Sequence, residues 1–431
     1  MDSISKRILL GSAGAGEEDY WIATLHGSSN EFGEDVAVDS AGNSYIVATS
    51  SSVSGGANHV LIVKYDTSGV IQWQRTLGSG NGNLGSKIAI DSSSNVYVIT
   101  NDSYKGVVAK YNSNGAIQWQ RKFTTTSNVF LSGVAVDGSG NVYVGGYTSQ
   151  SSAGANDFIT VKYNGSGTIL WQRRLGSFSQ EYLRDIAADS SGNVYAMGMT
   201  GSAGLGGNDI LLAKYNSTGV LLWQKSLGSS INEDGQAIQV DNSGNVYVFG
   251  ETGGTQDYII FKFNSNGVLQ WQRNVSDASK PFYLRHGAVD SSGNAYAAGW
   301  IYNNASSTFR GLIVKYNSSG TVQWQRTLTA PNIEIRGITA GDNQSIYVTG
   351  LVYFGGSYRM VAAKLPDDGS TGSSGTGTYA YFTYAASSFT TGTPTFSSGS
   401  LSFPAGTNSL TDAAASLTDA AISLTSFTFD L

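Results

Sequence analysis

The chain has 431 residues and a formal net charge of −6 at pH 7, with 55 Gly, 5 Pro and no Cys. The absence of Cys excludes disulfide scaffolds, thiolate zinc sites and cysteine nucleophiles, and the acidic balance argues against a nucleic-acid-binding surface. Charged residues make up only 13%, but 24 Tyr, 17 Phe and 8 Trp distinguish the chain from a disordered protein, which would be poor in aromatic residues.

Residues 1–18 predict an N-terminal arm that precedes the folded domain. Lys6 and Arg7 are followed by only three apolar residues, Ile8, Leu9 and Leu10, and then by a Gly/Ala-rich stretch. Such a stretch is shorter than the apolar core of a signal peptide. No segment reaches the roughly 18 apolar residues that span a membrane. We therefore expect neither a secretion signal nor a membrane span.

Three short motifs recur along the middle of the chain at intervals of about 50 residues. The tyrosines of the motif Asp-x-x-Gly-Asn-x-Tyr are Tyr45, Tyr97, Tyr143, Tyr195, Tyr247, Tyr296 and Tyr347. The lysines of the motif Lys-Tyr-Asn-x-x-Gly are Lys64, Lys110, Lys162, Lys214, Lys262, Lys315 and Lys364. The motif Trp-Gln-Arg/Lys begins at Trp73, Trp119, Trp171, Trp223, Trp271 and Trp324. A period of this length is typical of repeat architectures.

Each repeat predicts four short strands. In the third repeat they cover residues 133–137, 141–146, 158–163 and 169–175, with Gly/Asn turns between the first two and the last two. Such turns supply left-handed backbone conformations at low cost. Four strands per unit of about 50 residues indicate the blades of a β-propeller.

The repeat count predicts how the ring closes. Seven copies of the first three strands are accompanied by only six Trp-Gln-Arg/Lys strands, and Trp21 precedes Trp73 by one repeat. We therefore predict an all-β fold: a seven-bladed β-propeller of four-stranded blades over residues 19–365, whose last blade is closed by the N-terminal strand. The structural blade residues would be Trp21, Trp73, Trp119, Trp171, Trp223, Trp271 and Trp324.

The core Asp-x-x-Gly-Asn-x-Tyr-Val-x-Gly, complete at residues 137–146, resembles the bacterial β-propeller repeats called SBBP repeats. The resemblance covers about 350 residues, implies the propeller fold and carries no catalytic residues. Two repeats depart from it, because Ser94 replaces the turn glycine and Gly341 to Gln344 shift the aspartate.

The C-terminal part differs in composition. Residues 366–378 predict a flexible linker, and residues 379–431 predict a β-rich or low-complexity assembly segment. A seven-residue repeat, Leu-Thr-Asp-Ala-Ala-x-Ser, starts at Leu410 and Leu417 and favours either a short helix with a leucine seam or a low-complexity stretch. Alternation of Phe427, Phe429 and Leu431 indicates a strand. We expect the segment to order against a partner, adding strands to its sheet.

The repeated polar residues have a structural and a functional interpretation. Arg75, Arg121, Arg173, Lys225, Arg273 and Arg326 each follow a Trp by two residues. This spacing suggests cation–π pairs that brace neighbouring blades, with a ring of anion-binding cations as the alternative. The Asp-x-x-Gly-Asn turns favour turn capping over calcium binding, because each supplies too few oxygen ligands. We expect no metal and no cofactor.

The sequence offers little support for catalysis, and we predict that the protein is not an enzyme. His26, His59 and His286 fall in different repeats. Acidic residues gather before the first strands of several repeats, where paired carboxylates suit a glycosidase. These are Glu31, Glu34, Asp35, Glu181, Asp185, Glu233 and Asp234. A glycan lyase or hydrolase is the enzymatic alternative.

Repeats six and seven carry aromatic residues and arginines between their second and third strands, where other repeats have Ser, Gly and Ala. The candidate recognition patch is Trp300, Tyr302, Arg310, Tyr353, Phe354, Tyr358 and Arg359. Exposed aromatics with Arg suit stacking on a glycan or anchoring a protein interface. The alternative is that these side chains pack the longer loops onto the rim.

The arm from Ser5 to Gly16 resembles the start of virion structural proteins in phages of marine cyanobacteria. This resemblance implies a non-enzymatic phage virion protein, located on the particle surface or tail. Its expected partners are other virion proteins, contacted through the arm and the C-terminal tail, and a host-surface glycan or protein, within a symmetric or homo-oligomeric assembly. The alternative is a secreted bacterial adhesin at the cell surface.

Overall fold

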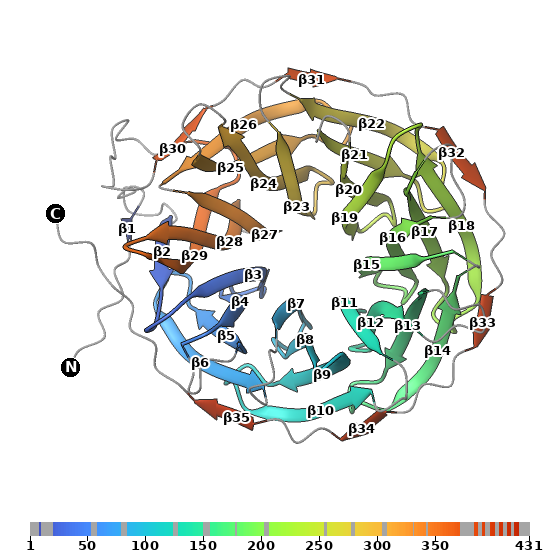
Figure 1. Cartoon of the computed structure of the whole chain (residues 1–431), viewed down its shortest axis with the longest axis horizontal. Helices are drawn as coiled ribbons and strands as arrows, with labels where there is room; N and C mark the ends of the chain where they lie inside the picture. Colours follow the sequence, from blue (N-terminus) through green and yellow to red (C-terminus); the bar gives the residue numbers. More distant parts are fainter. Residues whose placement is uncertain are drawn as a thin grey trace.

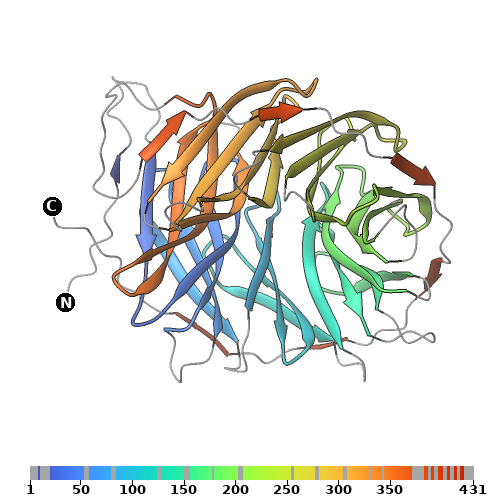
Figure 2. The ribbon, with the colours of Figure 1, turned by 45° about the horizontal axis from the view of Figure 1, so that its top comes forward.

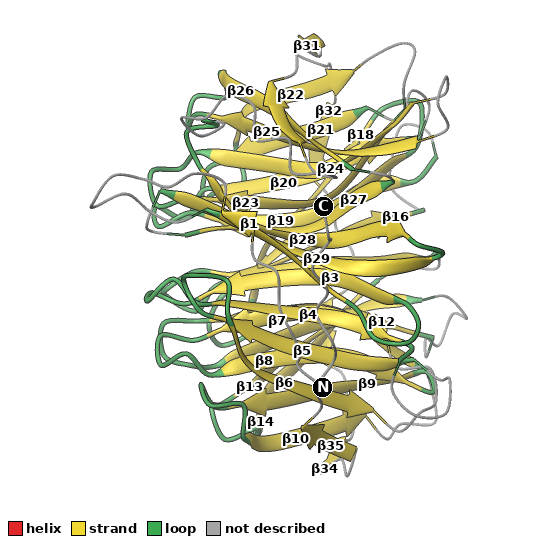
Figure 3. Ribbon diagram, turned by 90° about the vertical axis from the view of Figure 1, so that its left-hand side faces the viewer, coloured by secondary structure: helices red, strands yellow, loops and turns green. Residues whose placement is uncertain are grey.

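The computed structural model describes most of the middle of the chain and short parts of both ends. The described residues are 8–9, 20–52, 58–78, 84–123, 128–149, 156–176, 179–201, 207–253, 257–276, 281–303, 308–330, 332–341, 344–370, 383–386, 390–392, 397–400, 405–407, 412–414 and 418–421. These residues form strands, turns and loops and contain no helix (Figure 3). Accordingly, no helix suited to crossing a membrane occurs among them.

Antiparallel four-stranded sheets repeat around a central axis (Figure 1). The third blade consists of β11 (Val129–Val136), β12 (Val142–Thr148), β13 (Asp157–Tyr163) and β14 (Ile169–Leu175), each paired with the next. The first strand of each blade lies nearest the axis and the fourth lies at the rim (Figure 2).

The other strands follow the same order. The first blade has β3 (Glu31–Val38), β4 (Ser44–Ser50), β5 (His59–Tyr65) and β6 (Ile71–Gly78), and the second has β7 (Leu84–Ile90), β8 (Val96–Asp102), β9 (Lys105–Tyr111) and β10 (Ile117–Phe123). The fourth has β15 (Glu181–Ala188), β16 (Val194–Thr200), β17 (Asp209–Tyr215) and β18 (Leu221–Gly228). The fifth has β19 (Glu233–Val240), β20 (Val246–Thr252), β21 (Tyr258–Phe263) and β22 (Leu269–Ser276). The sixth has β23 (Phe282–Val289), β24 (Ala295–Asn303), β25 (Thr308–Tyr316) and β26 (Val322–Thr329).

The last sheet combines both ends of the repeat region. It contains β27 (Ile333–Ala340), β28 (Ser345–Phe354) and β29 (Ser357–Pro366), and β2 (Trp21–Leu25) pairs antiparallel with β29 so that Trp21 lies opposite Lys364. The strands β2 to β29 fit seven blades of four. The predicted all-β propeller architecture is therefore confirmed.

The innermost strands are longer than the sequence pattern indicates. We predicted residues 133–137 for the first strand of the third blade, whereas β11 starts at Val129. A β-bulge shifts its register between Leu131 and Gly133. The extra residue interrupts the two-residue alternation from which strands are recognised, so the first half of the strand was missed. The fourth strand, predicted as 169–175, coincides with β14.

The hydrophobic core lies between neighbouring blades rather than in one central mass. The cluster between the third and fourth blades includes Tyr143, Trp171, Leu183 and Ile186, none more than 9% exposed. Polar contacts accompany this packing, since the Tyr143 hydroxyl donates to the Asp137 carboxylate at 2.9 Å and lies 2.9 Å from the Gly192 carbonyl of the next blade.

The predicted linker begins too early. Residues 366–369 form the turn that follows the third strand in every other blade, with the Gly369 amide directed to the Pro366 carbonyl and a positive φ of 73° at Gly369. Nothing in the composition of this Asp- and Gly-rich stretch distinguishes a turn from a linker, so the boundary at residue 365 was wrong by four residues.

Short strands from the chain ends cover the outer edges of the blades (Figure 1). Near the N-terminus, β1 (Ile8–Leu9) pairs with β2. The C-terminal tail strands are β30 (Thr383–Ala386), β31 (Thr390–Gly392), β32 (Ser397–Ser400), β33 (Ala405–Thr407), β34 (Asp412–Ala414) and β35 (Thr418–Ala421). They pair antiparallel with β26, β22, β18, β14, β10 and β6, so the tail visits the sixth to the first blade in reverse order.

The tail advances by one seven-residue repeat per blade. Ser400, Thr407, Ala414 and Ala421 lie opposite Lys225, Arg173, Arg121 and Arg75, which occupy equivalent positions in four successive blades. In the sequence, a Phe or Leu recurs with the same spacing at Phe382, Phe389, Phe396, Phe403, Leu410, Leu417 and Leu424. The helical interpretation of this repeat is wrong where the structure describes it, because β34 and β35 are strands. The predicted strand around Phe427 lies outside the described residues.

Deleting residues 371–431 should expose the outer strands of six blades. Because backbone amides at an uncovered edge lose their partners, we expect faster hydrogen–deuterium exchange in β6, β10, β14, β18, β22 and β26 and a melting temperature lower by several degrees. Exchange in β2 provides the internal control, since β1 rather than the tail covers it. Unchanged exchange in the six outer strands would contradict the observed pairing.

Candidate functional site

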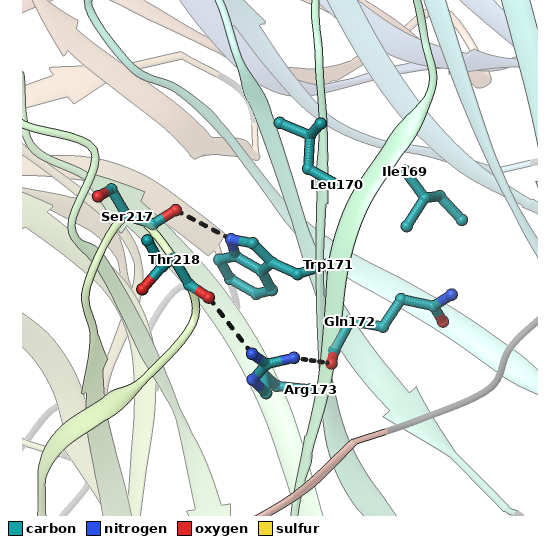
Figure 4. A pocket seen from close by; sticks show the side chains of 7 residues that line it. All are labelled: Ile169, Leu170, Trp171, Gln172, Arg173, Ser217 and Thr218. Carbon is teal, nitrogen blue, oxygen red and sulfur yellow. Dashed lines mark hydrogen bonds between the residues drawn. The ribbon is translucent and has the colours of Figure 1, made fainter.

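The repeated Trp and Arg residues lie at the junctions between blades. In the third blade the Trp171 indole donates to the Ser217 carbonyl at 3.1 Å, and the Arg173 guanidinium donates to the Thr218 carbonyl at 3.3 Å (Figure 4). Arg173 also donates to the Gly219 carbonyl at 2.5 Å and lies 5.5 Å from the indole. Lys162 donates to the same Ser217 carbonyl at 3.2 Å. The groove in Figure 4, bounded by residues 169–173, 217 and 218, is therefore a junction between blades.

The same tryptophan contact occurs at seven junctions. Indole nitrogens of Trp21, Trp73, Trp119, Trp171, Trp223, Trp271 and Trp324 donate to carbonyls of Thr67, Ser113, Gly165, Ser217, Ser265, Ser318 and Asp367. Since the contact recurs around the ring, we assign these residues to architecture rather than to a ligand site.

The Asp-x-x-Gly-Asn turns use their carboxylates internally. Asp137 accepts hydrogen bonds from the backbone amides of Ser139 and Asn141, from the Asn141 side chain and from the Tyr143 hydroxyl. Burial alone would raise the pKa of Asp137, but these hydrogen bonds outweigh it and lower the pKa. Among the described residues, no three acidic or histidine side chains are grouped as metal ligands.

The predicted recognition patch is divided between buried and exposed side chains. Trp300 is only 5% exposed and stacks on Tyr283 at 5.6 Å, so its indole is not presented to a ligand. Tyr353 and Tyr358 are 40% and 37% exposed and lie 5.1 Å apart. These two tyrosines belong to the hairpin of β28 and β29.

The remaining patch residues pack within the two hairpins. Tyr302 lies 5.1 Å from Phe309, and Arg359 lies 4.8 Å from the Phe354 ring. Arg310 is exposed on β25. The structure thus brings Tyr353, Phe354, Tyr358 and Arg359 together in the seventh blade, whereas Trp300, Tyr302 and Arg310 belong to the sixth.

A cluster of charged residues lies at the central channel, and of these only Glu34 was a candidate in the sequence analysis. The bulge in each innermost strand adds one residue. In the six blades other than the second, the added residues are Glu34, Ser132, Arg184, Gln236, Arg285 and Arg336. Together with Lys87 they line a cavity of about 390 Å³. Alignment of the repeats at this position would have shown that its charge varies from blade to blade, unlike that of the turn motifs.

Two carboxylates and one histidine lie next to this position, around a cavity of about 220 Å³ that Lys87 also lines. The Asp35 carboxylate accepts from the Ile88 amide of the next blade at 3.1 Å, and Asp185 accepts from the Ile238 amide at 3.0 Å. Burial raises the pKa of both carboxyl groups, while Lys87 opposes the change.

His286 takes the equivalent position in the sixth blade and is also buried. Its Nδ1 lies 3.1 Å from the Ile338 carbonyl, to which it donates when protonated there, and its Nε2 lies 3.5 Å from Asp35. Burial, helped by the positive charge of Lys87, lowers the pKa of His286 to about 3. The imidazole is therefore neutral near pH 7 and links two blades.

The predicted carboxylate pairs are separated by the fold. Glu31 accepts from Ser50, Ser52 and Gly27 at the start of β3, whereas Asp35 lies at the channel. In the fourth and fifth blades, Asp209 and Glu233 are both buried, and burial together with the charge of Glu233 raises the pKa of Asp209. His26 and His59 do not line either channel cavity.

Comparison with known proteins agrees with this architecture. Blades joined by repeated turn and tryptophan contacts define the chain as a β-propeller repeat protein, and the sequence profile of a β-propeller repeat matches residues 118–151. The profile of a family described as outer membrane protein assembly factor BamB matches residues 155–370, half of the chain. The chain belongs to this propeller family. No curated protein shows significant similarity to it.

Solved structures of other proteins resemble this chain at low sequence identity. The β-propeller domain of the Trilobed protease from Pyrococcus furiosus is 7% identical, with a TM-score of 0.50 over 78% of this chain and 94% of that one. A protein from Lactobacillus plantarum is 13% identical, with a TM-score of 0.46 over 74% and 94%. An ulvan lyase bound to a saccharide is 10% identical, with a TM-score of 0.48 over 81% and 97%. Likeness at such identities concerns the fold and not the activity.

Two turn glycines form a matched pair for testing the junctions. Gly219 (φ 80°) and Gly140 (φ 74°) both have a left-handed backbone, but a Cβ at Gly219 would lie 2.8 Å from Trp171, whereas one at Gly140 meets nothing within 4 Å. We expect Gly140→Ala to cost about 1 kcal/mol of unfolding free energy and Gly219→Ala about 1–3 kcal/mol more. Equal losses in denaturant unfolding would show that the glycine–tryptophan contact is unimportant.

Stability should depend on pH in opposite directions at two aspartates. Burial and the neighbouring Glu233 raise the pKa of Asp209 to about 6, so the folded state loses stability as pH rises from about 4, the unfolded-state pKa, to about 6. Asp209→Asn should therefore stabilise the protein at pH 8, on the order of 2 kcal/mol, and have little effect at pH 4.

Asp137 provides the contrast, because its folded pKa is lowered. Its stabilising effect is complete above about pH 4 and is lost as pH falls through the folded pKa. Asp137→Asn should consequently destabilise the protein at pH 8. Urea unfolding of both variants across this pH range checks the signs, and equal signs at pH 8 would contradict the assignment.

Proposed function

We propose that the chain is a non-enzymatic structural protein of a phage virion, in which the propeller is a rigid interaction module on the tail, a fibre or the capsid surface. In this proposal β2 closes the ring as the outer strand of the seventh blade. The pairing of Trp21 with Lys364 and the indole hydrogen bond from Trp21 to the first blade support this closure.

The observation that carries the proposal is the covering of the outer sheet edges by the two ends of the chain. β1 lies against β2, and the six tail strands lie against β6, β10, β14, β18, β22 and β26. Uncovered edges invite pairing with other chains, and covered edges prevent it. A propeller of this kind suits a particle component that must stay folded and unaggregated outside a cell.

The covered edges also indicate which surfaces remain for partners. Because β1 and the tail strands pair with blades of their own chain, we propose that both ends of the chain lie at the rim and that the arm and the tail contact other virion proteins there. The face that carries Tyr353 and Tyr358 is free for a host-surface glycan or protein. Symmetric copies of the module would follow the symmetry of the particle.

A glycan lyase or hydrolase is the second candidate, and one observation favours it. Asp35, Asp185 and His286 gather in the channel with shifted pKa values, a pattern that occurs at catalytic sites. Their hydrogen bonds to backbone groups of neighbouring blades support a structural role instead. A secreted bacterial adhesin remains the alternative among non-enzymes, and it would use the same covered edges.

Peptide-level mass spectrometry of purified phage particles from the source, with the copy number of this chain, tests the proposal. We expect a stoichiometric component whose copy number matches a particle symmetry. Absence from particles, together with recovery from culture supernatant or cell surface, would favour the adhesin. Turnover of a glycan by the purified chain that is lost in Asp185→Asn would favour the enzyme.

A further inference from the structure

Three arginines of different blades converge on one mouth of the channel. Arg184, Arg285 and Arg336, the channel arginines, occupy the bulge position of β15, β23 and β27, and they line the cavity of about 390 Å³ together with Lys87. Glu34 is the acidic residue among the lining side chains. Four cations facing one carboxylate give this cavity an excess of positive charge in a chain whose net charge is −6.

The carboxylates around the mouth neutralise the channel arginines only in part. Arg336 contacts Glu34 at 3.2 Å and Glu334 at 3.1 Å, and Arg184 contacts Asp234 at 3.1 Å. Arg184 nonetheless keeps 44% of its side chain exposed, and Arg285 is exposed as well. Burial raises the pKa of Glu34, and it raises the pKa of Glu251, near Arg285, to about 7. The Glu251 carboxyl group is therefore only partly ionised near pH 7.

Aromatic rings accompany the cations. An arc of four rings crosses the second to fourth blades: Tyr104 lies 5.9 Å from Phe130, Phe130 lies 5.0 Å from Tyr147, and Tyr147 lies 4.9 Å from Tyr182. Tyr104 is 64% exposed at the β8–β9 turn. The channel arginine Arg184 lies close to this arc, since burial raises the pKa of Tyr147 and the positive charge of Arg184 opposes that rise.

The other two channel arginines also lie beside rings. Arg285 lies 4.8 Å from the Trp300 ring and Arg336 lies 5.6 Å from the Phe32 ring. Phe32 in turn contacts Tyr358 at 5.3 Å. The exposed Tyr358 of the seventh blade is therefore linked through Phe32 to the channel arginine Arg336.

We propose that this mouth of the channel binds an acidic saccharide, whose carboxylate or sulfate group lies among Arg184, Arg285 and Lys87 and whose neighbouring sugar rings stack on the arc from Tyr104 to Tyr182. Guanidinium groups bind planar or tetrahedral oxyanions through paired hydrogen bonds. The apolar faces of sugar rings pack against aromatic side chains, which present large, rigid surfaces. The inference rests on the part of the proposed function that assigns glycan contact to this face.

The test is isothermal titration of the full-length chain with three probes: oligogalacturonate, a sulfated oligosaccharide of similar length and a neutral cello-oligosaccharide. We expect at least one acidic probe to bind about tenfold or more tightly than the neutral probe at low salt, and its affinity to fall as salt increases. The two acidic probes distinguish a carboxylate ligand from a sulfate ligand.

Variants locate the binding. Arg184→Ala and Arg285→Ala should each weaken the acidic probe about tenfold or more, because each removes a charge-assisted hydrogen bond. Tyr104→Ala should weaken acidic and neutral saccharides alike. Arg310→Ala is the matched control, since Arg310 is an exposed arginine that does not line the channel, and it should bind as the wild type does. Unchanged melting temperatures verify folding, and Arg184→Gln and Arg285→Gln replace any alanine variant that fails to fold.

Three results would overturn the proposal: no binding of either acidic probe at millimolar concentration, equal affinity for acidic and neutral probes, or wild-type affinity in the Arg184/Arg285 double variant. Loss of binding in Arg310→Ala alone would indicate a binding site at the sixth-blade hairpin and would also contradict binding at the channel. Because the titration uses the purified chain, acidic-saccharide binding by a protein that is absent from particles would reject the virion role and keep the site.

Discussion

The hydrogen bonds between blades are the interaction on which the rest of this structure depends. At each junction an indole, and beside it a lysine or arginine in most blades, donates to carbonyls of the turn in the next blade. The turn ends in a glycine with a left-handed backbone, as at Gly219. A Cβ there would overlap the tryptophan. The turn glycine, the indole and the cation thus form one unit, and their conservation within the chain reflects a single packing requirement.

This requirement explains why the architecture could be predicted from the sequence. Motifs that recur because every junction needs them are visible by comparison of the chain with itself, and they specify the blade, its turns and its fourth strand, as for residues 169–175. The two turns that depart from the motif still have a left-handed backbone, since Ser94 and Gln344 adopt positive φ values of 59° and 54°. The parts that were not predicted are the start of β11, where the bulge interrupts the alternation, and the turn at residues 366–369, whose composition is that of a linker.

The channel residues could not be inferred in the same way. Arg184, Arg285 and Arg336 occupy the extra residue of a bulge, which does not take part in the regular pairing of the strand. A position freed from the pairing can differ between blades, and here it is Glu, Ser, Gln or Arg. Trp300 was chosen instead because aromatic residues of the loops were expected to be exposed, but its indole is buried beneath Tyr283 and Arg285. In this propeller the repeated motifs specify the fold, whereas the residue at the bulge differs in charge and polarity from blade to blade.

The reverse course of the tail strands has a consequence for the order of folding. During synthesis the blades emerge from the first to the seventh, whereas the tail pairs with the sixth blade first and the first blade last. The tail emerges only after every outer strand that it joins, and domains generally begin to fold from the N-terminus as they are made. Its last strand, β35, pairs with β6, the outermost strand of the first blade to be made. Among the described residues, the tail strand that is made last therefore pairs with the blade that is completed first, and a chain truncated within the tail would leave the outer strands of the earliest blades uncovered.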